Sequence, residues 1–540
     1  MQIQGERLQG RKVSRPRGFR AQCFALCILP FLGGCLPGGI WGGDDESSRS
    51  SFAESPEDAP ALNRSYKTSF LPAKMPFFGA TTEDGQLTPD SGPSPSPSTS
   101  STVETRKPSQ VNTAPGLANA PTPLPAAQAL QNFYRALAAL SAGKRTQPVS
   151  VLHLGGDQIV DDRFAATLRE HLTSRFGNAG RGLMPPGLYP IRGIKIDRGG
   201  QWSLTSASGE GAGPFGITGA RVNAAANDAW LRFTSVEGAF DWVEVSLLTG
   251  PEQGTAAVSI DGDVRLVPTR SSAMAQTSIR VTAKAREIMI RPKGDGAISV
   301  LSVASGTHTS GLVYSNVGLP GATTSTIGKW KEDFAANDFR KLNPDLIVFE
   351  YGTREGFDDG LDMKQYEASL RFAINQIKSW APQASILIVG PPDAALLPAF
   401  AGSAGAQACR ALNAQEIAAY GQLMNRGDER LARWHAPPRL EAVRLALKRQ
   451  AVESGAFFWD WAKYMGGPCS IHAWTSLKPP LAAPDHVTLT EAGDERSARA
   501  LFAELMAGFE SYQRESKERT SVASAFTAVI EPAKAKKRNQ

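Results

Sequence analysis

The stretch Val151-Leu-His-Leu-Gly-Gly-Asp-Gln-Ile159 decides the fold of this chain. Residues 149–154 are apolar and partly β-branched, which predicts a buried strand. The pair of glycines after them predicts a sharp turn, and apolar residues at helical spacing follow. A residue at such a strand-to-helix turn lies at the carboxyl edge of the sheet, where open α/β sheets bind ligands. Asp157 is therefore the first candidate functional residue.

Similar alternation of strands and helices continues along the chain. Buried strands are predicted over 312–318, 345–352, 385–390 and 456–460, and helices over 126–140, 334–342, 366–380, 440–450 and 491–509. Alternation of this kind predicts a parallel sheet with helices on both faces. Between residues 190 and 305 the helical pattern gives way to short alternating stretches, which predict an inserted antiparallel β-sandwich. Its Trp202 and Trp230 are candidates to stack on sugar rings, with a role in the core as the alternative.

The N-terminus has the layout of a secretory signal. Basic residues precede an apolar run over 21–32, and small residues follow. The segment Leu32-Gly-Gly-Cys35 resembles a bacterial lipobox, whose cysteine is acylated. The alternative is an ordinary signal peptide with an incidental cysteine. Leu36 follows in place of the aspartate that retains many lipoproteins in the inner membrane, so the expected location is the periplasmic face of the outer membrane.

These patterns divide the chain into five parts. Residues 36–125 are too rich in Ser, Pro and Gly to offset the entropy of ordering, and they predict a disordered tether. The predicted parts are a lipoprotein-type signal peptide (1–35), the tether (36–125), the α/β domain (126–189 and 306–512), the inserted β-sandwich (190–305) and a charged tail (513–540).

Composition excludes some functions and favours one covalent link. Of the 540 residues 41% are hydrophobic, enough for a large core. The net charge is +6, but the chain has no basic stripe with aromatic residues interleaved in it. No nucleic-acid partner is therefore expected. No Cys/His cluster has metal-ligand spacing, and we expect no metal or cofactor. Beyond residue 35 the cysteines are Cys409 and Cys469, which predict one disulfide in an exported protein; the alternative is two separate thiols.

Several motifs together resemble the SGNH (GDSL-type) hydrolases, in particular their peptidoglycan O-acetylesterase branch. The resemblance covers residues 126–512 and implies a flavodoxin-like parallel sheet with an inserted β-sandwich. The segments that carry it are 151–159, Phe176-Gly-Asn-Ala-Gly-Arg-Gly-Leu-Met-Pro-Pro-Gly187, Gly213-Pro-Phe-Gly216, Val317-Gly-Leu-Pro-Gly-Ala322, Asn343-Pro-Asp-Leu-Ile-Val-Phe-Glu-Tyr-Gly-Thr-Arg-Glu355 and Asp485-His-Val-Thr-Leu-Thr490.

The resemblance also shows which catalytic positions have changed. In that family a serine in the first turn attacks an ester carbonyl, and a histidine three residues after an aspartate takes its proton. A glycine N–H and an asparagine side chain stabilise the oxyanion. Here Asp157 stands at the serine position, Arg354 at the asparagine position and Thr488 at the histidine position. Gly318 and Asp485 match the family pattern.

Two of these substitutions make sense as a pair. The family geometry places the serine and the asparagine on one oxyanion, so Asp157 and Arg354 are expected to face each other. A carboxylate and a guanidinium can form a bidentate ion pair there and fill the oxyanion site. The alternative is that each side chain points independently to solvent. His486 lies beside Asp485 but at a variable position of the motif, so it is not the expected base.

We therefore expect an envelope protein related to carbohydrate O-acetylesterases, degenerate in its catalytic motif. Its expected role is non-catalytic glycan binding or scaffolding. The expected partners are an envelope glycan such as peptidoglycan, the membrane through the lipid on Cys35, and an intact paralogue. The alternative function is an active O-acetylesterase with an unorthodox set of residues.

Overall fold

The computed structural model describes residues 123–187 and 189–536. The predicted signal peptide with Cys35, and all but the last three residues of the predicted tether, lie outside the described residues. Among the helices that are described, none combines the length and the apolar character needed to cross a membrane.

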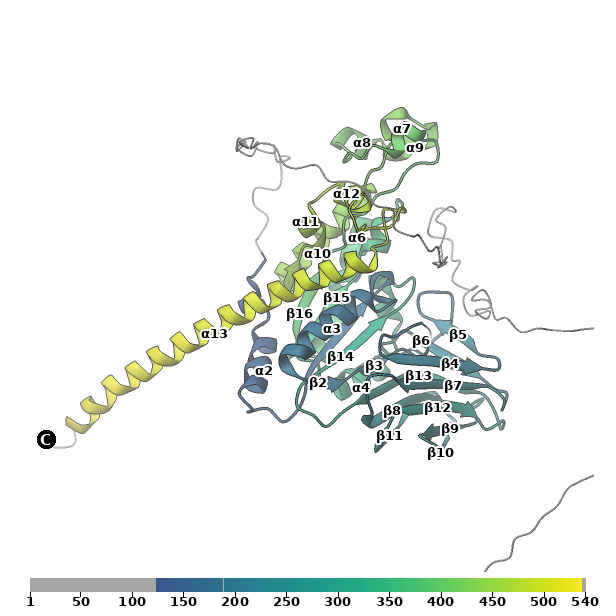
Figure 1. Cartoon of the computed structure of the whole chain (residues 1–540), viewed down its shortest axis with the longest axis vertical. Helices are drawn as coiled ribbons and strands as arrows, with labels where there is room; N and C mark the ends of the chain where they lie inside the picture. The colour runs from purple at the N-terminus through teal and green to yellow at the C-terminus, as the bar shows by residue number, and fades with distance from the viewer. Residues whose placement is uncertain (1–122, 188, 537–540) are drawn as a thin grey trace, which may run out of the picture. The chain divides into compact units, whose positions relative to one another are not determined.

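The centre of the α/β part is a parallel sheet of six strands (Figure 1). Its order is β17-β16-β15-β1-β14-β2, and β2 is a three-residue edge strand. With β2 left out, the other five strands run second-first-third-fourth-fifth by their place in the chain when read from β14 to β17, which is the flavodoxin-like order. The bounds are β1 Val149–Gly155, β2 Asn178–Gly180, β14 Leu312–Gly318, β15 Leu346–Glu350, β16 Ser385–Val389 and β17 Phe457–Trp459.

Helices cover both faces of this sheet. Alternate residues of β1 point to opposite faces, so Val149 and Val151 pack with one apolar cluster and Leu152 and Leu154 with the other. The first cluster draws on helices α1 Ala126–Ala129, α2 Gln131–Ser141, α3 Arg163–Phe176 and α13 Glu491–Lys536. The second draws on α4 Glu332–Leu342, α6 Met363–Trp380 and α10 Pro438–Ser454. The fold class expected from the sequence is confirmed.

The last helix is longer than the sequence pattern predicts. The apolar spacing predicts an end near Phe509, but α13 continues to Lys536. No glycine or proline interrupts the chain between residues 510 and 531, so backbone propensity extends the helix after its buried face has ended. Residues 513–536 of the predicted charged tail are therefore helical.

The inserted part consists of two antiparallel sheets with an apolar cluster between them. Their orders are β10-β9-β12-β7-β4 and β11-β8-β13-β6-β5, and β3 also pairs with β13. The strands are β3 Gly182–Met184, β4 Ile194–Gly199, β5 Ser203–Ser206, β6 Ala220–Ala224, β7 Trp230–Ser235, β8 Phe240–Thr249, β9 Thr255–Ile260, β10 Asp263–Pro268, β11 Ala275–Ala285, β12 Glu287–Pro292 and β13 Ile298–Gly306. Trp202 is buried in this core and Arg232 covers Trp230, so neither ring is an open platform.

A buried carboxylate joins the sandwich to the α/β part. Asp338 on α4 accepts hydrogen bonds from the side chain of Gln276 (2.7 Å) and the backbone N–H of Ile217 (3.1 Å). Burial raises the pKa of Asp338 to about 6, against the lowering effect of those bonds and of Lys341. The folded protein therefore holds a proton on Asp338 at pH values where the unfolded chain has released it.

The proton on Asp338 makes the free energy of unfolding fall as pH rises. Because the folded pKa is raised, the contribution of Asp338 is greatest below its unfolded pKa near 4 and is lost as pH rises to about 6. A shift of this size corresponds to at most ~3 kcal/mol. We expect Asp338→Asn to flatten the fall in unfolding free energy between pH 4 and pH 6 in urea titrations. An unchanged slope would show that other groups cause it.

The predicted disulfide is confirmed. Cys409 and Cys469 are bonded, with a Cα–Cα distance of 5.8 Å. The bond ties a helical excursion of the chain, residues 403–436, to the start of α12 Ser470–Thr475. The excursion carries α7 Ser403–Ala406, α8 Ala414–Ala418 and α9 Tyr420–Arg426. The remaining short helices are α5 Thr353–Gly356 and α11 Trp461–Met465.

Removing this bond should lower stability. It closes a sequence separation of 60 residues, and restraining a loop of that size in the unfolded chain contributes about 2–4 kcal/mol. We expect the variant Cys409→Ser/Cys469→Ser to lose that amount in urea unfolding. Unmodified protein treated with reductant is the matched control and should lose the same amount. A loss below about 0.5 kcal/mol in both would contradict a stabilising role.

Candidate functional site

The turn after β1 requires its two glycines because backbone carbonyl oxygens of neighbouring segments lie where a Cβ atom would be. A Cβ on Gly155 would lie 2.6 Å from the carbonyl oxygen of Glu350, and one on Gly156 would lie 2.9 Å from that of Ala322. Without side chains, the turn fits between the ends of β14 and β15, and the 3-10 helix η2 (Asp157–Ile159) begins at once. The local sequence thus fixes Asp157 at the carboxyl end of β1.

Three predicted site residues follow neighbouring strands. β1 pairs with β14 on one side and β15 on the other, and these two strands lie on opposite sides of the point where the strand order reverses. Asp157 follows β1, Gly318 ends β14, and Arg354 lies four residues after β15. Open α/β sheets bind ligands in the crevice at such a switch point.

The structure pairs Asp157 with Arg354 but does not make the pair bidentate. One contact joins them, from Arg354 Nη1 to Asp157 Oδ2 at 3.5 Å. The other carboxylate oxygen, Oδ1, accepts the backbone N–H of Gly321 at 2.8 Å, which turns the carboxylate away from a fork-to-fork arrangement. The Asp157 side chain is 49% exposed and that of Arg354 17%. The expected pairing is therefore right, and the expected bidentate geometry is wrong.

A buried glutamate fixes the segment that carries Arg354. Glu355 accepts hydrogen bonds from the N–H and hydroxyl of Thr324 (2.8 and 2.9 Å) and from the N–H of Gly352 (3.1 Å). Burial raises the pKa of Glu355, while these hydrogen bonds lower it. This carboxyl group ties α5 to the 3-10 helix η3 (Thr324–Lys329), which follows Gly321 by three residues.

The inserted sandwich contributes to the same place, which the sequence did not reveal. A Cβ added to Gly321 would lie 3.7 Å from Ser208 Cβ and 3.7 Å from Arg354 Cζ. The Ser208 hydroxyl lies 2.7 Å from that of Ser206. Lys329 donates to the carbonyl oxygens of Ala207 (2.7 Å) and Gly209 (3.2 Å), which holds this loop in place. A loop of the inserted sandwich therefore lies beside Gly321 and Arg354.

The final motif keeps the geometry of an aspartate that orients its partner. Asp485 Oδ2 accepts the hydroxyl of Thr488 at 2.7 Å, and Oδ1 accepts the N–H groups of Val487 and Thr488 at 2.9 Å each. In the described part of the chain, no hydrogen bond or ion pair joins Asp485 or Thr488 to Asp157 or Arg354. The side chain that Asp485 orients is a hydroxyl, which is not a base near neutral pH.

His486 is fully engaged by its surroundings. Its Nδ1 lies 2.8 Å from the carbonyl oxygen of Pro484, and its Nε2 lies 2.8 Å from Nδ1 of His472. The ring stacks on Trp434 with the centroids 3.6 Å apart. Burial lowers the pKa of His486. Both ring nitrogens therefore have partners, and the residue packs the disulfide-linked excursion against the final motif.

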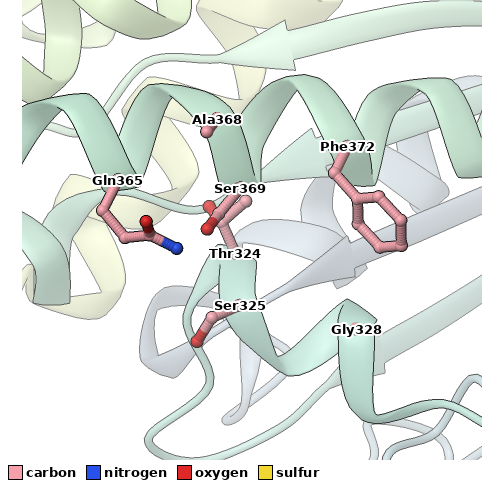
Figure 2. Close-up of a pocket in the computed structure, with 7 residues that line it drawn as sticks. All are labelled: Thr324, Ser325, Gly328, Gln365, Ala368, Ser369 and Phe372. Carbon is pink, nitrogen blue, oxygen red and sulfur yellow. The ribbon is translucent and has the colours of Figure 1, made fainter.

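A hollow lies between η3 and α6, apart from Asp157 and Arg354. Figure 2 shows the side chains of Gln365, Ser369 and Phe372 on α6 opposite η3. The hollow measures about 280 Å³ and contains no charged lining residue; it is lined by Thr324, Ser325, Gly328, Gln365, Ala368, Ser369 and Phe372. Phe372 is 52% exposed. Among residues 123–187 and 189–536, no cluster of three or more His, Cys, Asp or Glu side chains could hold a metal ion.

Comparison with solved structures gives the same fold. A structure entitled "Peptidoglycan O-acetylesterase in action" matches with a TM-score of 0.55 and 22% identity over 70% of this chain and 96% of that one. The chain thus shares the fold of that esterase. An acetyl xylan esterase (TM-score 0.24, 13% identity, 36% and 80% coverage) and an exo-β-1,3-galactanase from Phanerochaete chrysosporium (0.18, 16%, 24% and 29%) are similar over smaller parts.

Neither of the other two comparisons gives a match. No family model matches the chain, and no curated protein matches it.

Proposed function

We propose that this protein is a non-catalytic glycan-binding member of the SGNH-type esterases, held in the bacterial envelope by a lipid on Cys35. The observation that carries the proposal is the position of Asp157 and the bonding of its carboxylate. It occupies the nucleophile's turn, and its carboxylate is engaged by the Gly321 N–H and by Arg354. The protein whose fold the chain shares is a peptidoglycan O-acetylesterase, and this likeness favours an envelope glycan as the ligand.

Three features of the site argue against ester hydrolysis. The negative charge of Asp157 would repel an oxyanion developing beside it. Thr488 receives the hydrogen-bonded support of Asp485 but cannot remove a proton from a nucleophile. His486 has a partner at each ring nitrogen and is not free to act as the base. These features favour binding over the alternative of an active O-acetylesterase with unorthodox residues.

A binding assay tests the proposal and locates the site. The full chain should co-sediment with insoluble peptidoglycan, and Asp157→Ala/Arg354→Ala should weaken this binding at least tenfold because both charged groups are lost. Phe372→Ala, in the hollow between η3 and α6, is the matched control and should bind as the unmodified protein does. Loss of binding in the control alone would move the glycan site to that hollow.

The envelope partners have separate tests. Cys35→Ala should release the protein from the membrane fraction of a bacterial host, since the acylated cysteine is the proposed anchor. Retention in the membrane fraction would remove the anchor from the account. An intact esterase paralogue that acts with this protein should co-purify with it from the envelope.

A further inference from the structure

We infer that the site at Asp157 and Arg354 recognises the free hydroxyl groups of its glycan and discriminates against the O-acetylated form. The site would thus read the product of an O-acetylesterase instead of its substrate. This inference rests on the glycan-binding function proposed above, and it concerns which chemical form of the glycan is bound.

The accepting side of the site is the carboxylate of Asp157. It uses one oxygen for the Gly321 N–H and the other for the 3.5 Å contact with Arg354, and it is 49% exposed. An ionised carboxylate has about four acceptor positions, so positions remain open towards solvent. A sugar hydroxyl can donate its hydrogen to one of them. An acetyl ester at the same carbon has no hydrogen to donate and would direct its carbonyl oxygen at a negative charge.

The donating side is the guanidinium of Arg354. Within the described residues Arg354 makes one hydrogen bond, from Nη1 to Asp157, so Nε and Nη2 keep donors for a ligand. A Cβ added to Gly321 would only touch Arg354 and Ser208, at 3.7 Å each, so the glycine leaves room for one methyl group beside them. Adjacent acceptor and donor groups of this kind match neighbouring sugar hydroxyls, each of which both donates and accepts.

The charge balance favours a neutral ligand over an anion. A carboxylate on the glycan would be attracted by Arg354 but would meet Asp157 beside it, so the two effects oppose each other. A pair of hydroxyls satisfies both groups without repulsion. A site that hydrogen-bonds a hydroxyl rejects the analogue that lacks it, because the acceptor then loses its partner. Since Asp157 is half exposed, we expect discrimination of about 10- to 100-fold, the range of one hydrogen bond to a charged group.

The test uses one batch of naturally O-acetylated peptidoglycan, half of it de-O-acetylated by mild base. The full chain should bind the base-treated half at least tenfold more tightly. In Asp157→Asn the side-chain amide can donate to an acetyl carbonyl, so the preference should fall below threefold. Arg354→Gln should weaken binding to both halves by a similar factor and keep the preference. Circular dichroism and melting curves check that each variant is folded.

The outcomes separate the two proposals. Equal binding to both halves, or tighter binding to the acetylated half, overturns the inference and leaves glycan binding intact. A preference that survives in Asp157→Asn also overturns it, since the discriminating acceptor would lie elsewhere. Binding to neither half refutes the glycan-binding function itself, and the inference with it.

Discussion

Replacing three residues together by those that the resembled esterase family has at these positions, Asp157→Ser, Arg354→Asn and Thr488→His, is expected to produce acetyl-ester hydrolysis at least 100-fold above that of the unmodified protein. Two parts of the required geometry are already present. Asp485 holds the Thr488 side chain at 2.7 Å and would orient a histidine in its place. The glycine turn presents residue 157 at the carboxyl edge of the sheet. The measurement is release of acetate from a soluble acetyl ester.

The three single substitutions are the matched controls for the triple variant. Nucleophile, base and oxyanion donor act as a unit, so their effects are strongly non-additive. Asp157→Ser alone should stay inactive, because Thr488 provides no base and Arg354 loses its partner. Asp157→Ser should also cost less than about 1 kcal/mol of stability, since Asp157 is half exposed and makes one long contact with Arg354. Activity in that single variant equal to the triple variant would contradict the assigned roles.

Asp162→Asn is expected to destabilise the fold by about 3–5 kcal/mol. Asp162 directly precedes α3 and is 1% exposed. Its carboxylate binds both terminal nitrogens of Arg169 (3.1 and 3.2 Å) and lies 3.6 Å from Arg181. It also accepts hydrogen bonds from Asn316 and the backbone of Arg192 (2.9 Å each). The variant leaves the buried guanidinium of Arg169 without its anion, whereas Arg181 keeps its ion pair with Glu237 at 3.0 Å. Urea unfolding measures the loss.

The neighbouring residue provides the control for this prediction. Asp161 is 42% exposed and pairs with Arg163 at 2.6 Å. Removing an exposed pair costs less than about 1 kcal/mol, so Asp161→Asn should change stability little. If Asp162→Asn also lost less than about 1 kcal/mol, the buried pairing would not stabilise the fold as argued.

The fold could be predicted because its signals are local. Apolar runs ending in glycine mark β1 and β14, and alternation with helices implies a parallel sheet. The disulfide could be predicted from the isolation of Cys409 and Cys469. The end of α13 could not, since the helix continues after its apolar face has ended.

The candidate site was predictable only in part. The resemblance to a known family placed Asp157 opposite Arg354, and the structure brings them together. It could not show that the Gly321 N–H takes one carboxylate oxygen, because backbone donors leave no sequence signal. Ser208 was also missed, since it lies in a separate segment that reaches the site only through tertiary packing with Lys329.

The central claim is that this esterase fold binds glycan without hydrolysing it. The most direct test is acetate release from O-acetylated peptidoglycan by the unmodified full chain, measured beside Asp157→Ala. The account predicts that the two proteins release acetate at the same background rate. Steady turnover by the unmodified protein that disappears in Asp157→Ala would contradict it, and would make this protein an active esterase with an aspartate at the nucleophile's turn.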